Sequence, residues 1–181
     1  MNNEEIVKKM MKCINFSAIK HRNQRRSDPQ STPFINHPIG VAYILTNEGD
    51  IGDLEVIQAA LLHDTVEDTK TTFEELEEHF GPTVTHIVKE LTDDKSLPKE
   101  EQNRLQIERA RHSSHQAKLV KLADKLYNLR DIERAIPRGW SRSRAYEYFL
   151  FSKKVVDGLR GTNEGIEKEL DKLFRKYGLI P

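Results

Sequence analysis

The sequence predicts an all-α protein, and three observations support this fold class. Apolar residues recur at steps of three and four nearly everywhere, first in the series Ile6, Met10, Cys13 or Ile14, and Ala18. No stretch alternates polar and apolar residues with a period of two. Prolines, glycines and helix-capping residues separate the periodic stretches. We therefore expect one domain over residues 1–181, a bundle of about eight to ten helices.

The first helix is expected around residues 6–18, and a loop containing Pro29 and Pro33 follows it. In "HPIGVAYILTNEG", Pro38 suits the first turn of a helix and Gly49 suits its end. Asp53 then suits the N-cap of a buried helix that reads "DLEVIQAALLHD". These signals predict two core helices close together in the chain.

The middle of the chain carries further helix signals. Thr72 and Glu75 have the spacing of a capping box, Gly81 suits a helix end, and Pro82 opens the next helix. The segment "LPKEEQNRLQIERA" is charged and has few apolar positions. We therefore expect it to form an exposed helix with mobile ends around residues 93–97, and it need not carry chemistry.

The last third of the chain predicts three helices. Two long, well-packed helices are expected at about 114–134 and 141–159, joined by the helix breakers of "AIPRGW". A final helix is expected at about 163–177. No repeat, low-complexity tract or linker divides the chain.

Composition restricts the class of function. Lys plus Arg equals Asp plus Glu at 29 each, so no overall field attracts nucleic acid or an anionic membrane. The single cysteine, Cys13, excludes an internal disulfide framework, and the N-terminus lacks the features of a signal peptide. The mean hydropathy is −0.69, and no apolar run is long enough to cross a bilayer. We expect a soluble cytoplasmic protein with no membrane or nucleic acid partner.

The stretch "LLHDTVEDT" is the main candidate for a functional site. It ends an apolar run and places His63, Asp64, Glu67 and Asp68 within six residues. Buried ionisable groups are costly unless they are paired or bind a metal. The spacing of His63 to Glu67 and of Asp64 to Asp68 puts each pair on one face if the helical turn persists.

Two residues from other predicted helices extend this candidate site. His37 immediately precedes a helix-starting proline. Asp124 occupies an apolar stripe with Ala117, Val120 and Tyr127, and Asn128 lies one turn below it. A carboxylate at a core position requires a cation, and there are two alternatives for it. In one, Asp124 pairs with Lys121 or Lys125, and His63 is a capping or core histidine. In the other, Asp124 and His63 bind a metal ion.

The metal-site alternative has a defined donor set, which comprises His37, His63, Asp64 and Asp124. Two imidazoles and two carboxylates suit Mn²⁺, Fe²⁺ or Zn²⁺ better than Mg²⁺ or Ca²⁺. No cysteine joins the set, which disfavours a structural zinc site.

Two further segments are candidates for ligand binding. The basic run "KHRNQRR", which includes Arg26, is either a solvated face or an anion clamp beside the metal site. In "GWSRSRAYEYF", Trp140, Arg144 and Tyr148 could receive a base or a phosphate, with Arg144 and Tyr148 on one helix face. The alternative is that Tyr148 and Phe149 belong to the core.

The order of these motifs resembles a known family. His37, "HD" at 63–64, "ED" at 67–68 and "LADKLYNLRD" at 122–131 resemble the HD-domain metal-dependent phosphohydrolases, and within them the RelA/SpoT hydrolase domain and the small metazoan SpoT homologues. The resemblance implies one Mn²⁺ per chain, with Zn²⁺ or Fe²⁺ as alternatives, and catalytic roles for Glu67 and Asp68 on the attacking water. It implies metal binding by His37, His63, Asp64 and Asp124. It also implies a nucleotide site formed by Arg26, Asn128, Trp140, Arg144 and Tyr148.

The sequence departs from the bacterial pattern at three positions. Ser27 stands where bacterial relatives usually have Lys, Phe34 where they have Tyr, and Tyr127 where His is common. The first two changes place one phosphate contact and one hydroxyl contact in question, and none touches the metal set. The chain also has no room for a synthetase domain, so we expect hydrolysis without synthesis.

The resemblance implies a specific activity. We expect an Mn²⁺-dependent 3′-pyrophosphohydrolase that converts guanosine 3′,5′-bis(diphosphate), ppGpp, to GDP and pyrophosphate. One alternative is that NADPH is the physiological substrate and loses its 2′-phosphate, and another is a nucleotide-binding sensor without turnover. The intact set of acidic and histidine residues disfavours the sensor. The sequence leaves the oligomeric state, the native metal and the regulation open.

Overall fold

The structure is a computed structural model that describes all 181 residues and confirms the all-α fold class. It contains ten α-helices and no strand, apart from an isolated β-bridge between Arg25 and Pro33. The helices are α1 (Asn3–His21), α2 (Asn36–Asn47), α3 (Leu54–Leu62), α4 (Thr65–Asp68), α5 (Phe73–Phe80), α6 (Pro82–Leu91), α7 (Lys99–Ala110), α8 (His115–Arg134), α9 (Arg142–Asp157) and α10 (Glu164–Lys176).

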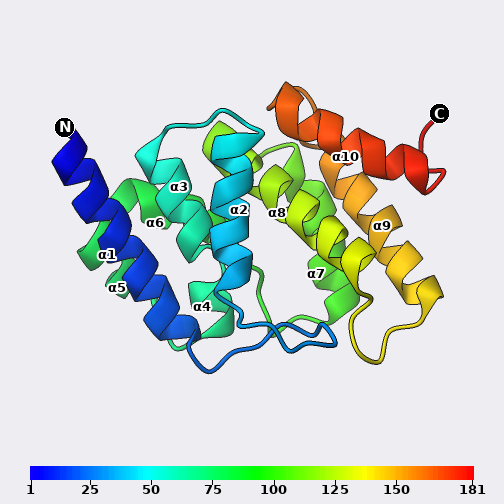
Figure 1. Cartoon of the computed structure of the whole chain (residues 1–181), viewed down its shortest axis with the longest axis horizontal. Coiled ribbons are helices and arrows are strands. Elements are labelled where there is room, and N and C mark those ends of the chain that lie inside the picture. The colour runs from blue at the N-terminus through cyan, green and yellow to red at the C-terminus, as the bar shows by residue number, and fades with distance from the viewer.

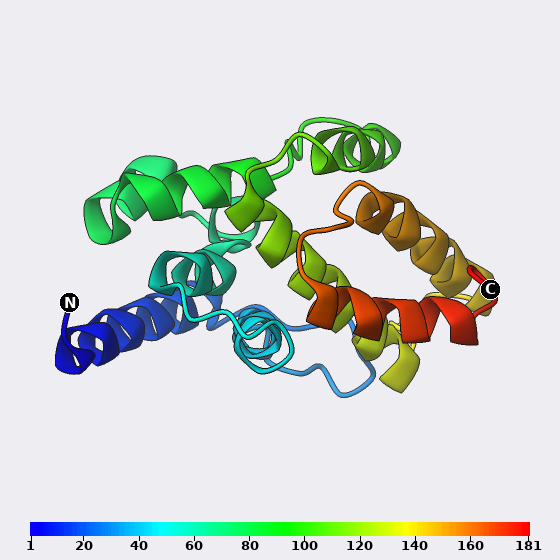
Figure 2. The same cartoon turned by 90° about the horizontal axis from the view of Figure 1, so that it is seen from above.

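Helix α8 joins two groups of helices. It packs against α2, α3 and α6 on one side and against α9 and α10 on the other. Figures 1 and 2 show α8 running between the N-terminal group, with α1, α3, α5 and α6, and the group that contains α7, α9 and α10. The two termini lie at opposite ends of the molecule (Figure 1).

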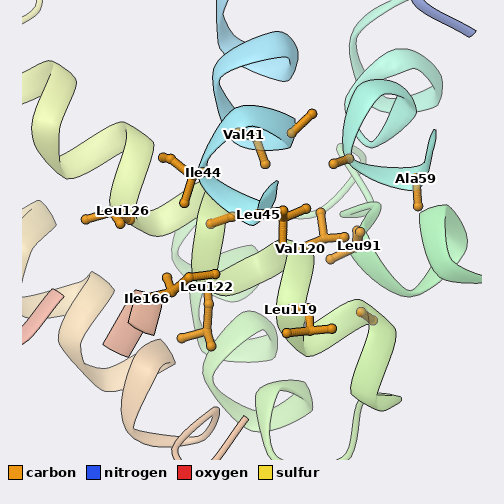
Figure 3. Close-up of a cluster of buried hydrophobic side chains, with 14 of the residues drawn as sticks. Val41, Ile44, Leu45, Ala59, Leu91, Leu119, Val120, Leu122, Leu126 and Ile166 are labelled. Carbon is orange, nitrogen blue, oxygen red and sulfur yellow. The ribbon is translucent and has the colours of Figure 1, made fainter. Parts of the chain in front are cut away.

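A continuous core of 34 buried residues includes side chains from nine of the ten helices, all but α4. Figure 3 shows its centre, where Val41, Ile44 and Leu45 of α2 lie beside apolar side chains of α8 such as Val120 and Leu122. This packing fixes α2, α3 and α8 relative to one another. The positions of polar side chains on these three helices are therefore determined by the core.

Most predicted helix starts are confirmed. The side chain of Asp53 accepts from the backbone N–H groups of Glu55 and Val56, and Ser114 and Asn163 cap α8 and α10 in the same way. Gly81 ends α5 with a positive φ of 86°, a conformation that favours glycine.

The predicted capping box at the start of α5 is only half formed. Thr72 accepts from the backbone N–H of Glu75, but the Glu75 carboxylate pairs with Lys20 of α1 at 2.7 Å instead of returning to the backbone. A tertiary ion pair replaces the local bond. A complete capping box occurs at the start of α1, between Asn2 and Glu5.

The condition for the two pairs to share helix faces is met only in part: the helical turn does not persist through the "HD" pair. α3 ends at Leu62, His63 and Asp64 form a turn, and the four-residue α4 follows. The backbone N–H of Asp68 still bonds to Asp64 O at 3.0 Å, so these two residues share one helical turn. No equivalent bond links Glu67 to His63, and Glu67 and His63 therefore do not lie on one continuous helix.

None of the ten helices combines the length and the apolar character that a membrane span requires.

Candidate metal centre and nucleotide pocket

Side chains satisfy the carbonyl groups at the buried end of α3. Thr65 Oγ1 donates to Leu62 O at 2.7 Å, and His63 Nδ1 lies 2.6 Å from Ala60 O. A helix leaves its last carbonyl groups without intrahelical partners, so these bonds allow α3 to end inside the protein. The break turns Asp64 and the "ED" pair toward the same region as His63.

The hydrogen bond to Ala60 fixes the tautomer of the neutral His63 ring. A carbonyl oxygen only accepts, so Nδ1 carries the proton and Nε2 of the neutral ring keeps its lone pair. An imidazole that is oriented in this way through its other nitrogen is typical of metal-ligating histidines. His63 therefore presents one donor atom to the centre of the site.

His37 is placed by close packing between α2 and α8. The Tyr127 ring lies edge-on to the His37 ring, with centroids 4.8 Å apart. The same ring occupies the space that a Cβ at Gly40 would need, so only glycine allows this approach one turn along α2. The pocket thus uses Tyr127, one of the departures from the bacterial pattern, to position a histidine.

Four side chains converge from α2, the turn after α3, and α8. His37 Nε2 lies 3.3 Å from His63 Nε2, 3.3 Å from Asp64 Oδ2 and 3.1 Å from Asp124 Oδ1. His63 Nε2 lies 3.1 Å from the same oxygen of Asp64 and 3.4 Å from that of Asp124. Ligand atoms about 2.1 Å from one ion are roughly 3 to 3.4 Å from each other, so these five distances fit a shared cation. The ligand atoms that all lie within 4.8 Å of one another are those of His37, His63 and Asp124, without Asp64.

The electrostatics of the cluster also favour a cation. Burial disfavours the imidazolium of His63, yet the carboxylates of Asp64 and Asp124 raise its pKa well above the usual value. Burial likewise acts to raise the pKa of both carboxyl groups, but the neighbouring imidazoles outweigh it and lower the pKa of each. The two anions therefore hold positive charge between them, and His37, His63 and Asp124 form a buried group suited to a divalent metal ion.

Glu67 and Asp68 lie beside this cluster in different surroundings. Glu67 Oε1 accepts from the backbone N–H of Asp93 at 2.7 Å. Asp68 accepts from Lys95 Nζ at 2.6 Å and from Gln24 Nε2 at 3.3 Å. Burial, aided by nearby carboxylates, raises the pKa of Glu67 to about 7 despite the Asp93 bond. Glu67 can thus exchange a proton near neutral pH.

Asn128 links the metal cluster to Arg26. Its Nδ2 donates to Asp124 Oδ1 at 3.2 Å, and its Oδ1 accepts from Arg26 Nη2 at 3.1 Å. Arg26 also pairs with Asp131 through Nε and Nη2, at 3.2 and 2.9 Å. Its guanidinium lies over the rings of Phe34 and Tyr127, 5.7 and 5.5 Å from their centroids. The solvated-face alternative therefore does not hold for Arg26.

A second ion pair anchors the loop that carries Arg26. Asp28 accepts from the backbone and the hydroxyl of Thr32, at 2.8 and 2.6 Å, and from Arg134 Nη2 at 3.1 Å. These bonds, the Thr32 hydroxyl first, hold the pKa of Asp28 at about 2 against the opposing effect of burial. Arg134 also pairs with Asp131. The loop before α2 is thus tied to the end of α8.

A cavity of about 260 Å³ opens beside Arg26 and Asn128. Trp140 and Tyr148 also line it, with ring centroids 5.9 Å apart, whereas Phe149 belongs to the core. Arg144 does not line the cavity: it is exposed and stacks on Trp140, with the guanidinium carbon 4.5 Å from the ring centroid. Of the five predicted nucleotide residues, the structure gathers four around one pocket and places Arg144 at its edge.

Sequence reasoning missed four residues that contact the site. Gln24 and Lys95 hold Asp68, the Asp93 backbone holds Glu67, and Asp131 holds Arg26. The segment around residues 93–97, where we expect mobile helix ends that need not carry chemistry, supplies two of these contacts. No periodic pattern marks it, because its position depends on packing between distant helices.

The alternative explanation for Asp124 finds no support. Neither Lys121 nor Lys125 forms an ion pair with Asp124, whose partners are His37, His63 and the Asn128 amide. Burial lowers the pKa of the Lys125 amine, although Asp124, Asp93, Asp64 and Glu67 act in the opposite direction. The charge of Asp124 is therefore balanced inside the cluster.

Comparisons with known proteins agree with this arrangement. A family model described as HD domain matches residues 13–148. Two curated relatives named guanosine-3′,5′-bis(diphosphate) 3′-pyrophosphohydrolase MESH1 come from Danio rerio and Homo sapiens. They are 65% and 60% identical over 170 residues, which are 94% of this chain in both cases and 94% and 95% of the relatives.

A solved structure described as a metazoan ortholog of SpoT that hydrolyzes ppGpp superimposes with a TM-score of 0.93. Its sequence is 56% identical, and the match covers 95% of this chain and 97% of the other. The family resemblance predicted from the motifs is confirmed. The chain belongs to the HD-domain family and, within it, to the group of small metazoan SpoT relatives that includes the MESH1 proteins.

Proposed function

We propose that this protein is a metal-dependent hydrolase that removes the 3′-pyrophosphate of ppGpp and releases GDP and pyrophosphate. The observation that carries the proposal is the link through Asn128, which joins a cation-binding cluster to a cavity lined by Arg26 and two aromatic rings. A cluster for phosphate chemistry and a pocket for a nucleoside thus share one side chain. The names of the relatives support the same activity. We treat residues 1–181 as one HD-type phosphohydrolase domain.

His37, His63, Asp64 and Asp124 would hold one metal ion, for which we propose Mn²⁺ because the donor set mixes nitrogen and oxygen. When bound, such an ion neutralises phosphate charge and lowers the pKa of an attacking water. The protein groups keep the site ready for it, since His63 is oriented by Ala60 and Asp124 by Asn128.

Glu67 is the better candidate for the general base. Its pKa of about 7 suits proton uptake from water at neutral pH. In the reaction the water oxygen joins phosphorus, the bond from phosphorus to the ribose 3′-oxygen breaks, and that oxygen receives a proton. Asp68 is held by Lys95 and Gln24, so it would position the water and Glu67 would move the proton.

The pocket residues would bind the nucleotide. Arg26 is held flat by Asp131 and Asn128, so it offers a fixed planar surface for a base and a charge for phosphate. Trp140 and Tyr148 would form the opposite wall, and Arg144 would act from the edge through Trp140.

A product-release assay tests the proposed function. Purified protein is stripped with EDTA, reloaded with Mn²⁺, Zn²⁺ or Fe²⁺, and supplied with ppGpp or NADPH. We expect stoichiometric GDP and pyrophosphate from ppGpp, with the highest rate for Mn²⁺ and none in EDTA. Phosphate release from NADPH alone would make the 2′-phosphatase the activity of this site. Binding of ppGpp without release under any metal would instead indicate a sensor.

A further inference from the structure

The loop of residues 92–98, between α6 and α7, holds both carboxylates that lie beside the metal cluster. The backbone N–H of Asp93 donates to Glu67 Oε1 at 2.7 Å, and Lys95 Nζ donates to Asp68 at 2.6 Å. The Asp93 bond is the sole hydrogen bond that Glu67 accepts from the protein. Because this bond occupies Oε1, the other oxygen of Glu67 is free to contact a water molecule. The orientation of Glu67 therefore depends on the position of the loop.

Two glutamines of α7 bind the two ends of this loop. Gln102 Nε2 donates to Leu97 O at 2.8 Å, at the end of the loop next to α7. Gln106 Nε2 donates to the Asp93 carboxylate, at the end next to α6. The two glutamines are four positions apart and lie on one face of α7. Since the loop contains no helix or strand, these side chains do much to fix its position.

A role in stability alone does not explain the amide of Gln106. Its Oε1 is buried and accepts no hydrogen bond within the protein, whereas its Nε2 bonds to Asp93. A buried polar atom without a partner destabilises a fold. Asp93 is only half-buried, so water can solvate its carboxylate if the amide is removed. What the amide supplies is a fixed position for Asp93.

We infer that Gln106 is a positioning residue for the general base: by holding Asp93, it fixes the backbone N–H that orients Glu67. The inference rests on the proposed function, in which Glu67 moves the proton, and extends it to α7. This helix contributes no residue to the buried metal-binding group or to the lining of the nucleotide cavity. Replacement of Gln106 should therefore lower kcat and leave metal and substrate binding unaltered.

The competing explanation is that Gln106 only ties α7 to the loop and so supports the fold. The two explanations predict different results in the Glu67→Gln background. If Gln106 acts through Glu67, its replacement loses its effect on kcat once the carboxylate is absent, because residues in one chain of contacts do not act additively. If Gln106 only supports the fold, its replacement lowers Tm in either background and leaves kcat per folded molecule unchanged.

The experiment compares the wild type, Gln106→Met, Glu67→Gln and the double variant, with Arg104→Met as a control. Methionine keeps the length of Gln106 and removes its amide. The control removes from α7 a side chain that is exposed and pairs with two glutamates of the same helix. For each Mn²⁺-loaded protein, one measures Tm and the kcat and KM for ppGpp. Amide hydrogen exchange of Asp93, followed by NMR on the metal-free protein, reports its bond to Glu67 without turnover.

We expect Gln106→Met to lower kcat by about 10- to 100-fold, the usual effect of a misplaced catalytic group. KM for ppGpp should change by less than about threefold, and Tm by less than about 4 °C. In the Glu67→Gln background, the same substitution should change kcat by less than about threefold. The Asp93 amide should exchange at least about tenfold faster in Gln106→Met, because its bond opens more often. Arg104→Met should behave as the wild type.

An unchanged kcat in Gln106→Met overturns the inference, as does an equal loss of kcat in the wild-type and Glu67→Gln backgrounds. Unchanged exchange of the Asp93 amide also overturns it, since the bond to Glu67 would then not depend on Gln106. If the wild-type protein fails to hydrolyse ppGpp but Gln106→Met still accelerates exchange of the Asp93 amide, the proposed function fails and the positioning of Glu67 by Gln106 stands.

Discussion

The proposed metal cluster and the proposed nucleotide pocket meet at one residue, Asn128, but they are built by different physical means. In the cluster, His37, His63 and Asp124 are 2%, 3% and 7% exposed and lie within or at the ends of helices fixed by the core. In the pocket, Arg26 lies in a loop and is fixed by other polar groups, chiefly Asp131.

This difference bears on how each region should respond to change. A cluster residue cannot move without disturbing close-packed helices, so its loss removes a donor that nothing replaces. A pocket residue belongs to a network in which Arg134 and Asp28 also take part. Its neighbours therefore keep part of the network in place when it is replaced. We expect large effects of substitution in the cluster and graded effects in the pocket.

The strongest test of the contrast is Asp124→Asn. The substitution keeps the volume and removes the charge, so the protein should fold but lose more than about 10²-fold in metal affinity, beyond the usual effect of an outer-shell partner. Activity on ppGpp should be lost. Elemental analysis and far-UV circular dichroism are the measurements, with the surface variant Asp157→Asn as control. Stoichiometric Mn²⁺ and full activity in Asp124→Asn would remove Asp124 from the donor set.

Glu67→Gln should separate proton transfer from metal binding. We expect the metal to be retained and kcat to fall by roughly 10²- to 10⁴-fold, the usual contribution of a positioned acid or base. A base with a pKa of about 7 must be deprotonated to act, so wild-type activity should rise as the pH rises through about 7. The residual activity of Glu67→Gln should lack this rise with pH.

The stability of the metal-free protein provides an independent check on Glu67. A carboxyl group whose folded-state pKa is raised takes up protons on folding, so it destabilises the fold increasingly as the pH rises from its ordinary 4.5 to about 7. The difference in free energy of unfolding between Glu67→Gln and the wild type should therefore increase in favour of the variant between pH 4.5 and about 7. Above pH 7 this difference should stay constant.

The kinetic experiment can contradict the proposed role of Glu67. Weaker metal binding by Glu67→Gln with unchanged kcat at saturating Mn²⁺ would make Glu67 a ligand or a support.

The sequence predicts the helices well because their signals are local. Asp53, Ser114 and Asn163 each cap a helix at the expected place. Where a local signal competes with a tertiary contact, the prediction is less accurate, as at Glu75, whose carboxylate pairs with Lys20 of α1 instead of with the backbone. The sequence leaves open whether the helical turn persists after Leu62, because the break depends on side chains that satisfy buried carbonyl groups.

In the candidate site too, the sequence predicts the residues that carry a local signal and misses those that only the fold brings in. Asp124 draws attention because it interrupts an apolar stripe, and its helical position brings it to His37 and His63. Asp131 and Lys95 give no such signal: each is an ordinary charged residue in the sequence, and only the fold places it against Arg26 or Asp68. Sequence patterns locate residues on helices, whereas the partners of loop residues require the structure.

Substitution of Arg26 tests whether the pocket responds in a graded way. Arg26→Ala should raise KM for ppGpp by about 10- to 100-fold and lower kcat less, because contacts made equally in the ground and transition states contribute uniform binding. Arg26→Lys keeps the charge but loses the planar fork, so it should recover only part of the loss. Steady-state constants at two salt concentrations are the measurement. An unaltered KM in both variants would place the phosphate clamp elsewhere.

Arg144→Ala should have the smallest effect of the four changes. Arg144 is exposed, lies outside the cavity, and contacts Trp140 only through a stacked guanidinium. An exposed cation–π contact contributes about 0.5 to 1 kcal/mol, which corresponds to a two- to fivefold rise in KM if Arg144 acts by holding Trp140. Trp140→Phe in the Arg144→Ala background then decides the route. If Arg144 acts through Trp140, the double variant should raise KM no more than Trp140→Phe alone, because the two side chains form one unit. Independent, multiplying effects on KM would show that Arg144 contacts the nucleotide directly and belongs to the pocket after all.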